Sequence, residues 1–167
     1  MARMPEVVTH RYNPEIGPYQ NICSLPDSEA SAIIDRLRSK YCSTLKANYL
    51  VRRRSAEQWL SITASVLLGR RVKHWPTYFF LGDFSHVEDR SRPSALVIPL
   101  SRLPQDALTF TLGDSMKIAE ERMPRLFSLR EIVDLFAEGE PVAGFGISDK
   151  SGVQARFIEM QLWDCAA

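Results

Sequence analysis

One carboxylate near the C-terminal end of the chain lies among large apolar residues on a predicted strand. Residues 156–164 read RFIEMQLWD, and strict alternation puts Phe157, Glu159, Gln161 and Trp163 on one face. If that face lines a cleft, the carboxylate can act as a general base or stabilise a cationic transition state. If the face is exposed instead, Glu159 is a solvated residue that pairs with an arginine. The residues alone leave both interpretations open.

A second feature that could carry chemistry is the concentration of basic residues in residues 36–75. This segment holds ten lysines and arginines and one acid, Glu57, so it carries +9 in a chain whose net charge is +1. Charge segregated in this way can create a positive potential that attracts nucleic acid or an acidic protein. The alternative is a solvated surface whose cations pair with acids of the same fold.

Several other kinds of site have little support in the sequence. The three histidines and three cysteines are widely spaced and form no zinc-ligand pattern, so no metal site is predicted. There is no nucleophile elbow, phosphate-binding glycine loop or dinucleotide fingerprint. A metal nuclease built on Asp83, Asp114 and Glu159 would need an ordered Asp…Glu-x-Lys run, which is missing.

The elements that must position these residues follow from periodicity and from capping residues. We predict an N-terminal arm over residues 1–18 and a single α+β domain over 19–167, since 167 residues suit one core. Helices are expected mainly in the N-terminal half, and a mixed or antiparallel sheet is expected largely from the C-terminal half. The predicted helices are 26–40, 48–69 and 128–139, and the predicted strands are 19–25, 77–82, 94–100, 107–112, 142–149 and 153–163.

The sequence also predicts helix caps, the position of one strand in the sheet and the buried face of the long helix. Asn48 and Gly69 are expected to cap the long helix, and Ser128 with Glu131 forms a predicted capping box. The apolar run SALVIPL is typical of a central strand. The buried stripe of the long helix is expected to comprise Ala56, Trp59, Leu60, Thr63 and Leu67.

The sequence also predicts a cytoplasmic protein without a membrane partner. No apolar run approaches the roughly 20 residues that span a bilayer. The first residues, MARMPEVVTHRYNPE, lack the apolar core of a signal peptide.

Four short segments, in chain order, resemble the motifs of bacterial ADP-ribosyltransferases of the DNA-targeting toxin type. In that family the first strand carries a histidine or polar motif, a middle segment an arginine, a later strand an aromatic pair, and a late strand the catalytic glutamate. The matching segments are NICS at 21–24, YLVRRR at 49–54, YFF at 78–80 and FIEMQ at 157–161. The chain departs from the family where Asn21 replaces the histidine and where Phe157 replaces a Gln or Glu.

The resemblance implies an enzyme that uses NAD as a substrate and transfers ADP-ribose to a nucleic-acid or protein acceptor. Glu159 would be the catalytic residue that stabilises the oxocarbenium ion. NAD would be held by Asn21 and Ser24 at the ribose or amide, by Tyr78 or Phe79 at the nicotinamide, and by an arginine such as Arg52 or Arg53 at the pyrophosphate. The alternative function is a non-catalytic binding domain that docks nucleic acid or an acidic partner through residues 36–75.

Overall fold

The computed structural model describes residues 3–41, 45–73, 75–138 and 157–164. Within these residues the chain forms four α-helices and a six-stranded antiparallel sheet, which confirms the predicted α+β class. The helices are α1 (Asp27–Tyr41), α2 (Tyr49–Leu68), α3 (Ser115–Ala119) and α4 (Leu129–Glu138). The strands are β1 (Val7–Tyr12), β2 (Thr77–Leu81), β3 (Ser94–Pro99), β4 (Leu108–Thr111), β5 (Phe127–Ser128) and β6 (Glu159–Leu162). Short 3-10 turns lie at Ile22–Ser24 (η1), Leu100–Arg102 (η2) and Gln105–Ala107 (η3).

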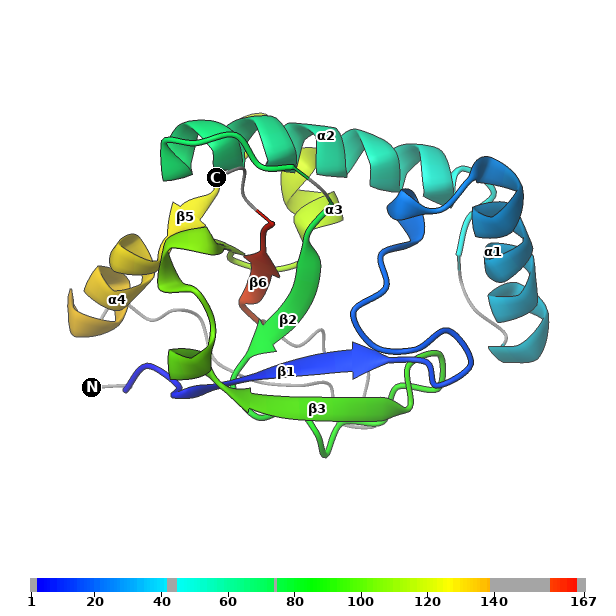
Figure 1. Ribbon diagram of the computed structural model, residues 1–167, viewed down its shortest axis with the longest axis horizontal. Helices are drawn as coiled ribbons and strands as arrows, with labels where there is room; N and C mark the ends of the chain where they lie inside the picture. The colour runs from blue at the N-terminus through cyan, green and yellow to red at the C-terminus, as the bar shows by residue number, and fades with distance from the viewer. Residues whose placement is uncertain (1–2, 42–44, 74, 139–156, 165–167) are drawn as a thin grey trace.

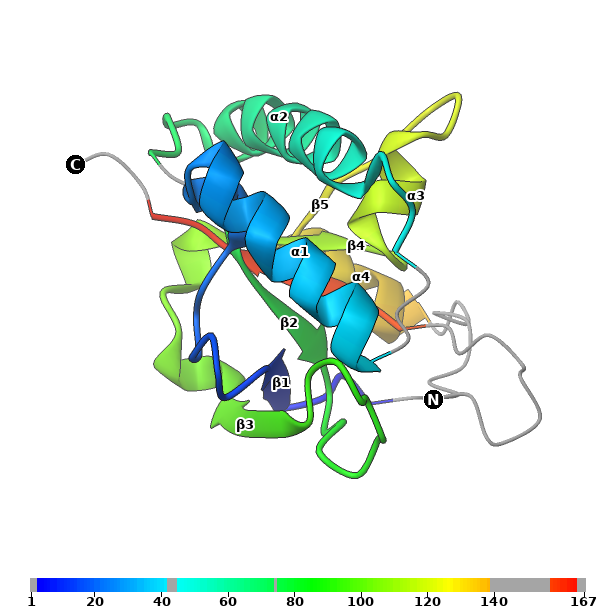
Figure 2. The same cartoon turned by 90° about the vertical axis from the view of Figure 1, so that its right-hand side faces the viewer.

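The last strand lies in the middle of the sheet. The strand order is β3-β1-β2-β6-β4-β5, so β6 is paired on both sides. Its register sets Glu159 opposite Phe80 of β2 and Thr111 of β4, and sets Gln161 opposite Tyr78 and Thr109. Helix α2 runs along one side of the sheet (Figure 1), and α1 crosses the end of the sheet below α2 (Figure 2).

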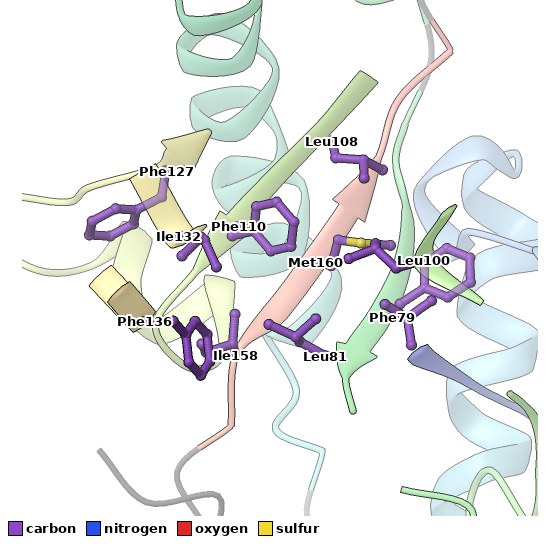
Figure 3. Close-up of a cluster of buried hydrophobic side chains, with 11 residues drawn as sticks. Phe79, Leu81, Leu100, Leu108, Phe110, Phe127, Ile132, Phe136, Ile158 and Met160 are labelled. Atoms are coloured by element: carbon purple, nitrogen blue, oxygen red, sulfur yellow. The ribbon is translucent and has the colours of Figure 1, made fainter. Parts of the chain in front are cut away.

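Both faces of β6 are covered, each by a different helix. Ile158 and Met160 join the larger apolar core, to which α4 contributes Ile132 and Phe136 (Figure 3). On the opposite face, Trp163 packs against Leu60 and Ala64 of α2 and against Val72. Because alternate residues of a strand point to opposite faces, Glu159 and Gln161 lie on the α2 side together with Trp163. The prediction of a shared face for these three residues is therefore confirmed, and that face is buried.

The predicted helix ends agree with the structure more closely than the predicted helix face. Gly69 ends α2 in the left-handed region at φ 67°, where glycine has no Cβ penalty. Ser128 and Glu131 form the reciprocal capping box of α4, whereas Asn48 precedes α2 without a side-chain cap. Gly139 lies outside the described residues.

The buried side of α2 differs from the predicted stripe. It consists of Ala56, Glu57, Leu60 and Ala64, while Trp59, Thr63 and Leu67 are only half-buried. The prediction that Trp59 is buried was wrong, because Trp59 only packs against the edge of the cluster formed by Leu60, Ala64 and Trp163, while Glu57 is fully buried.

Three strand predictions also differ from the structure. Residues 7–12 of the predicted N-terminal arm form β1, an interior strand between β3 and β2. The predicted strand at 19–25 is instead the turn η1, which the side chain of Asn21 caps by accepting from the Cys23 N–H. The predicted central strand at 94–100 is the edge strand β3, on which Val97 is 40% exposed. The segments 142–149 and 153–156 lie outside the described residues.

In the part of the chain that the structure describes, every helix is too short or too polar to cross a bilayer.

Candidate functional site

A pocket of about 390 Å³ lies on the α2 side of the sheet, at the end covered by α1. Its base is formed by β1, β2 and the start of β6, and its sides by α1, η1, the first turns of α2 and the segment before β3. The polar and charged side chains at the pocket include those of Asn21, Tyr49, Arg53, Tyr78, Arg92, Asp114 and Glu159.

Glu159 is held in this pocket by a chain of hydrogen bonds across the sheet. The indole N–H of Trp163 donates to Thr109 Oγ1 at 2.8 Å, and the Thr109 hydroxyl donates to Gln161 Oε1 at 3.0 Å. The amide of Gln161 donates to Glu159 Oε1 at 3.2 Å and to Thr111 Oγ1 at 3.1 Å. The alternating polar residues of β6 are thus one connected network that fixes the carboxyl group.

The charge of Glu159 is set by burial and by its neighbours. The residue is only 8% exposed, and loss of solvent raises the pKa of its carboxyl group. The positive charge of Arg53 and the nearby Ser115 hydroxyl oppose this rise, while the charge of Asp114 adds to it. The Ser115 hydroxyl is buried near the carboxyl and has no hydrogen-bond partner of normal geometry among the described residues. A carboxylate with a raised pKa beside one arginine is suited to a role as base or as partner for a cation.

A second buried carboxylate, that of Glu57 on α2, forms an ion pair with Arg53. Glu57 is 0% exposed, and its oxygens accept from Arg53 Nε at 3.1 Å and from the Tyr78 hydroxyl at 3.0 Å. The Asn21 amide donates to both oxygens, at 2.9 and 3.1 Å. The Arg53 guanidinium also lies over the Tyr78 ring, 4.1 Å from its centroid. Glu57 therefore fixes three side chains of the pocket from beneath.

Burial raises the pKa of Glu57, and Arg53, Asn21 and Tyr78 oppose that rise by stabilising the ionised form. Sequence reasoning missed Glu57 as a site residue. Two signals were present, namely that it is the one acid in residues 36–75 and that it follows Arg53 by four residues, the spacing of a helical ion pair.

His10 of β1 is a further pocket residue that the sequence did not single out. Its Nδ1 lies 2.8 Å from the Tyr78 carbonyl oxygen, and its Nε2 accepts from the Tyr19 N–H at 2.9 Å. Because a backbone N–H can only donate, Nε2 must be unprotonated and Nδ1 must carry the proton. Tyr19 stacks on the ring at 5.0 Å with φ 62°, a conformation that few non-glycine residues adopt. Neutral His10 thus joins the segment after β1 to strand β2.

We expect the stability of the protein to fall in acid because of His10. Burial is the largest cause that lowers the pKa of His10 from its usual 6.5, and Arg92 lowers it further. A lowered pKa means that the contribution of His10 is fully present above pH 6.5 and is lost as the pH falls through the lower, folded-state value. Melting temperatures of the wild type and of His10→Gln, measured from about pH 8 to about pH 5, should converge toward acid.

The control for this experiment is His86→Gln, at an exposed position. It should keep the pH profile of the wild type. A His10→Gln profile parallel to that of the wild type would contradict the assignment of the neutral ring.

The predicted site residues are only partly brought together. Asn21, Arg53, Tyr78, Phe79 and Glu159 are all pocket residues, although Phe79 mainly fills the large core. Ser24 is exposed on η1 and donates to the Asn21 carbonyl oxygen, and it does not line the pocket. Arg52 also points elsewhere and forms a two-point ion pair with Glu120, at 2.7 and 2.9 Å.

The side chain of Asn21 has little capacity left for a ligand. Its Nδ2 donates to Glu57 and to the Pro76 carbonyl oxygen, and its Oδ1 accepts from the Cys23 N–H. The hydroxyl of Tyr49 is different, because it lies at the pocket without a hydrogen-bond partner among the described residues. Burial raises the pKa of Tyr49, so the hydroxyl stays protonated and can donate.

Most of the predicted basic segment is paired within the chain. Arg52 pairs with Glu120, Arg53 with Glu57, Arg54 with Asp27 and Arg70 with Asp106. The three cations of α1 pair with Glu15 or Asp35. Lys46, Arg71 and Lys73 are the exposed cations of the segment that form no ion pair with a described residue.

The residues of the metal-nuclease alternative do not meet. Asp114 and Glu159 are at the pocket, whereas Asp83 is exposed and accepts from Ser85. Within the described ranges, no three His, Cys, Asp or Glu side chains are grouped as they would be around a metal ion.

Comparison of this chain with protein-family models, with curated proteins and with solved structures finds no match.

Proposed function

We propose that the pocket binds NAD and that Glu159 promotes transfer of ADP-ribose from NAD to an acceptor. The observation that carries this proposal is the buried Glu159 carboxylate, fixed beside Arg53 and Tyr78 in one pocket with aromatic residues. A fixed negative charge in a site of low dielectric acts most strongly where positive charge develops.

The reaction places positive charge on the sugar. The bond between the nicotinamide nitrogen and C1′ of the ribose breaks, and its electron pair leaves with nicotinamide. C1′ then carries oxocarbenium character, which the Glu159 carboxylate stabilises electrostatically. An acceptor hydroxyl, carboxylate or base nitrogen forms the new bond to C1′, and where it carries a proton Glu159 can accept it.

Other pocket groups have roles that follow from their contacts. The Tyr49 hydroxyl is free to donate to a ribose or amide oxygen. Arg53 opposes the burial-driven rise in the pKa of both buried carboxyl groups, Glu159 and Glu57, which favours a charged Glu159 before NAD enters. His10 lies on β1 at the pocket, ahead of the NICS segment at 21–24 that the resemblance matched to the first motif. Both of its ring nitrogens bind backbone groups, so His10 supports the pocket instead of contacting NAD.

The direct test is calorimetric binding of NAD, followed by measurement of nicotinamide release with protein, DNA and RNA acceptors. Binding at submillimolar NAD together with slow release that an acceptor accelerates is the expected result. Absence of NAD binding at millimolar concentration would overturn the proposal.

The alternative function, docking of nucleic acid or an acidic protein through residues 36–75, has less support because seven of the ten cations already pair with acids of the chain. We therefore expect no binding of a generic DNA duplex at physiological salt in a fluorescence titration. Binding that weakens steeply with salt would favour the alternative. Each phosphate contact should contribute about −0.9 to the slope of the logarithm of the binding constant against the logarithm of the salt concentration. Arg71→Met/Lys73→Met would then reduce that slope.

A further inference from the structure

The arginines that the sequence suggested for the pyrophosphate are committed elsewhere. Arg52 pairs with Glu120 outside the pocket. Arg53 is bound to Glu57 and is attracted by Glu159, so two carboxylates compensate its single charge. A dianionic diphosphate therefore needs another cation at the pocket.

The end of the pocket next to Phe80 holds two further arginines. Arg11 of β1 is only 7% exposed and forms no ion pair with the acids that the structure describes. Its guanidinium donates to three carbonyl oxygens of the segment between β2 and β3, those of Phe84, Ser85 and Arg92, at 3.1 to 3.4 Å. Arg11 thus fixes this segment and leaves a positive charge beneath it that no described acid compensates.

Arg92 also lines the pocket, and its backbone carbonyl oxygen is one of the three to which Arg11 donates. Its Nε forms an ion pair with Asp89 at 2.9 Å, and its guanidinium lies 5.6 Å from the centroid of the Phe80 ring. Unlike Arg53, Arg92 is paired with a single carboxylate, and that pair uses only Nε. The two Nη groups have no partner in the described residues, and the side chain is 48% exposed, so it is open to a ligand. The amide of Asn13 donates to the neighbouring Ser91 carbonyl at 3.0 Å, which fixes the backbone that carries Arg92.

Arg92 is also close to the proposed reaction centre. Phe80 is the register partner of Glu159 across β2 and β6, and Phe157 packs on the edge of the Phe80 ring at 4.9 Å. A ligand that places its ribose at Glu159 therefore reaches Arg92 across a single aromatic side chain.

We infer that Arg92, supported by the uncompensated charge of Arg11, forms an anion subsite that binds the diphosphate of a nucleotide, with Phe80 and Phe157 beside it. The Nη groups of Arg92 form charge-assisted hydrogen bonds to the phosphate oxygens. This inference rests on the proposed function, because it assigns the phosphate end of the same NAD pocket.

The test compares Arg92→Met with Arg90→Met, a matched control two residues away at an exposed position outside the pocket. Calorimetry uses ADP-ribose and ADP as phosphate-bearing ligands and adenosine as the phosphate-free ligand. Loss of one charge-assisted contact in Arg92→Met should lower the affinity for ADP-ribose and for ADP by about tenfold to a hundredfold. Adenosine affinity should be unchanged, Arg90→Met should match the wild type, and Arg92→Lys should recover part of the loss.

The outcomes separate this subsite from the catalytic proposal. ADP binding that requires Arg92, in a protein that does not cleave NAD, would support the subsite and overturn the transferase function. NAD cleavage with an unchanged KM in Arg92→Met would overturn the subsite and leave that function intact. Failure of the wild type to bind either ADP or ADP-ribose, or an equal loss in Arg90→Met, would also overturn the subsite.

Discussion

Replacement of Glu159 by glutamine should reduce nicotinamide release from NAD by about 10²–10³ while changing NAD affinity little. Glutamine keeps the shape of the side chain and removes only the charge, and a preorganised group aimed at developing charge contributes on this scale. The measurement is single-turnover nicotinamide release together with calorimetric NAD binding. Glu121→Gln, at an exposed position, is the matched control and should keep wild-type activity.

The same substitution should stabilise the protein at neutral pH. The pKa of Glu159 is raised in the folded state, so its contribution is greatest in acid and is lost as the pH rises through the folded-state pKa. Glutamine cannot ionise and avoids that loss, so Glu159→Gln should melt higher than the wild type at neutral pH and lose this advantage in acid. The activity of the wild type should rise with pH through an apparent pKa above the ordinary range of glutamate. A variant with unchanged activity and unchanged stability would contradict both the catalytic role of Glu159 and the raised pKa of its carboxyl group.

Replacement of Arg53 by methionine should destabilise the fold by about 3–5 kcal/mol at neutral pH. Removing one partner of a buried ion pair leaves the other charge without compensation, and here Glu57 is 0% exposed. Urea denaturation measures the loss. Arg52→Met is the matched control, because Arg52 is the adjacent residue and its partner Glu120 is exposed, so a much smaller loss is expected.

A second variant identifies the cause of that destabilisation. Arg53→Met/Glu57→Gln removes both charges and should recover a large part of the stability lost in Arg53→Met. The penalty of Arg53→Met should also shrink in acid, because the raised pKa of Glu57 lets protonation neutralise the uncompensated carboxylate. Equal destabilisation in the single and double variants at every pH would assign the effect to lost packing on the Tyr78 ring.

Features that depend on neighbouring residues were accessible from the sequence. The αL glycine after α2, the capping box of α4 and the alternation of β6 are all set by residues within a few positions of one another. The alternation already placed Glu159, Gln161 and Trp163 on one face. The α+β class followed from the order of such local patterns.

Tertiary structure decided the features that depend on distant partners. Residues 7–12 form a strand because they pair with residues about 70 to 90 positions later, at Leu81 and Ser94, and no local pattern records that pairing. The apolar run at β3 is an edge strand because β1 pairs with it on one side only.

Dependence on distant partners also explains why the sequence could not predict the pairing of the polar site residues. Whether a charge is free or compensated depends on what the fold brings beside it, so the sequence could count the basic residues but not pair them. Glu57 became a buried partner of Arg53, while Arg11 became a buried cation held by carbonyl groups. The sequence by itself determined that Glu159 shares a strand face with Gln161 and Trp163. Only the packing of β1, β2 and α2 around β6 determined that Glu159 lies in a pocket with one shared cation.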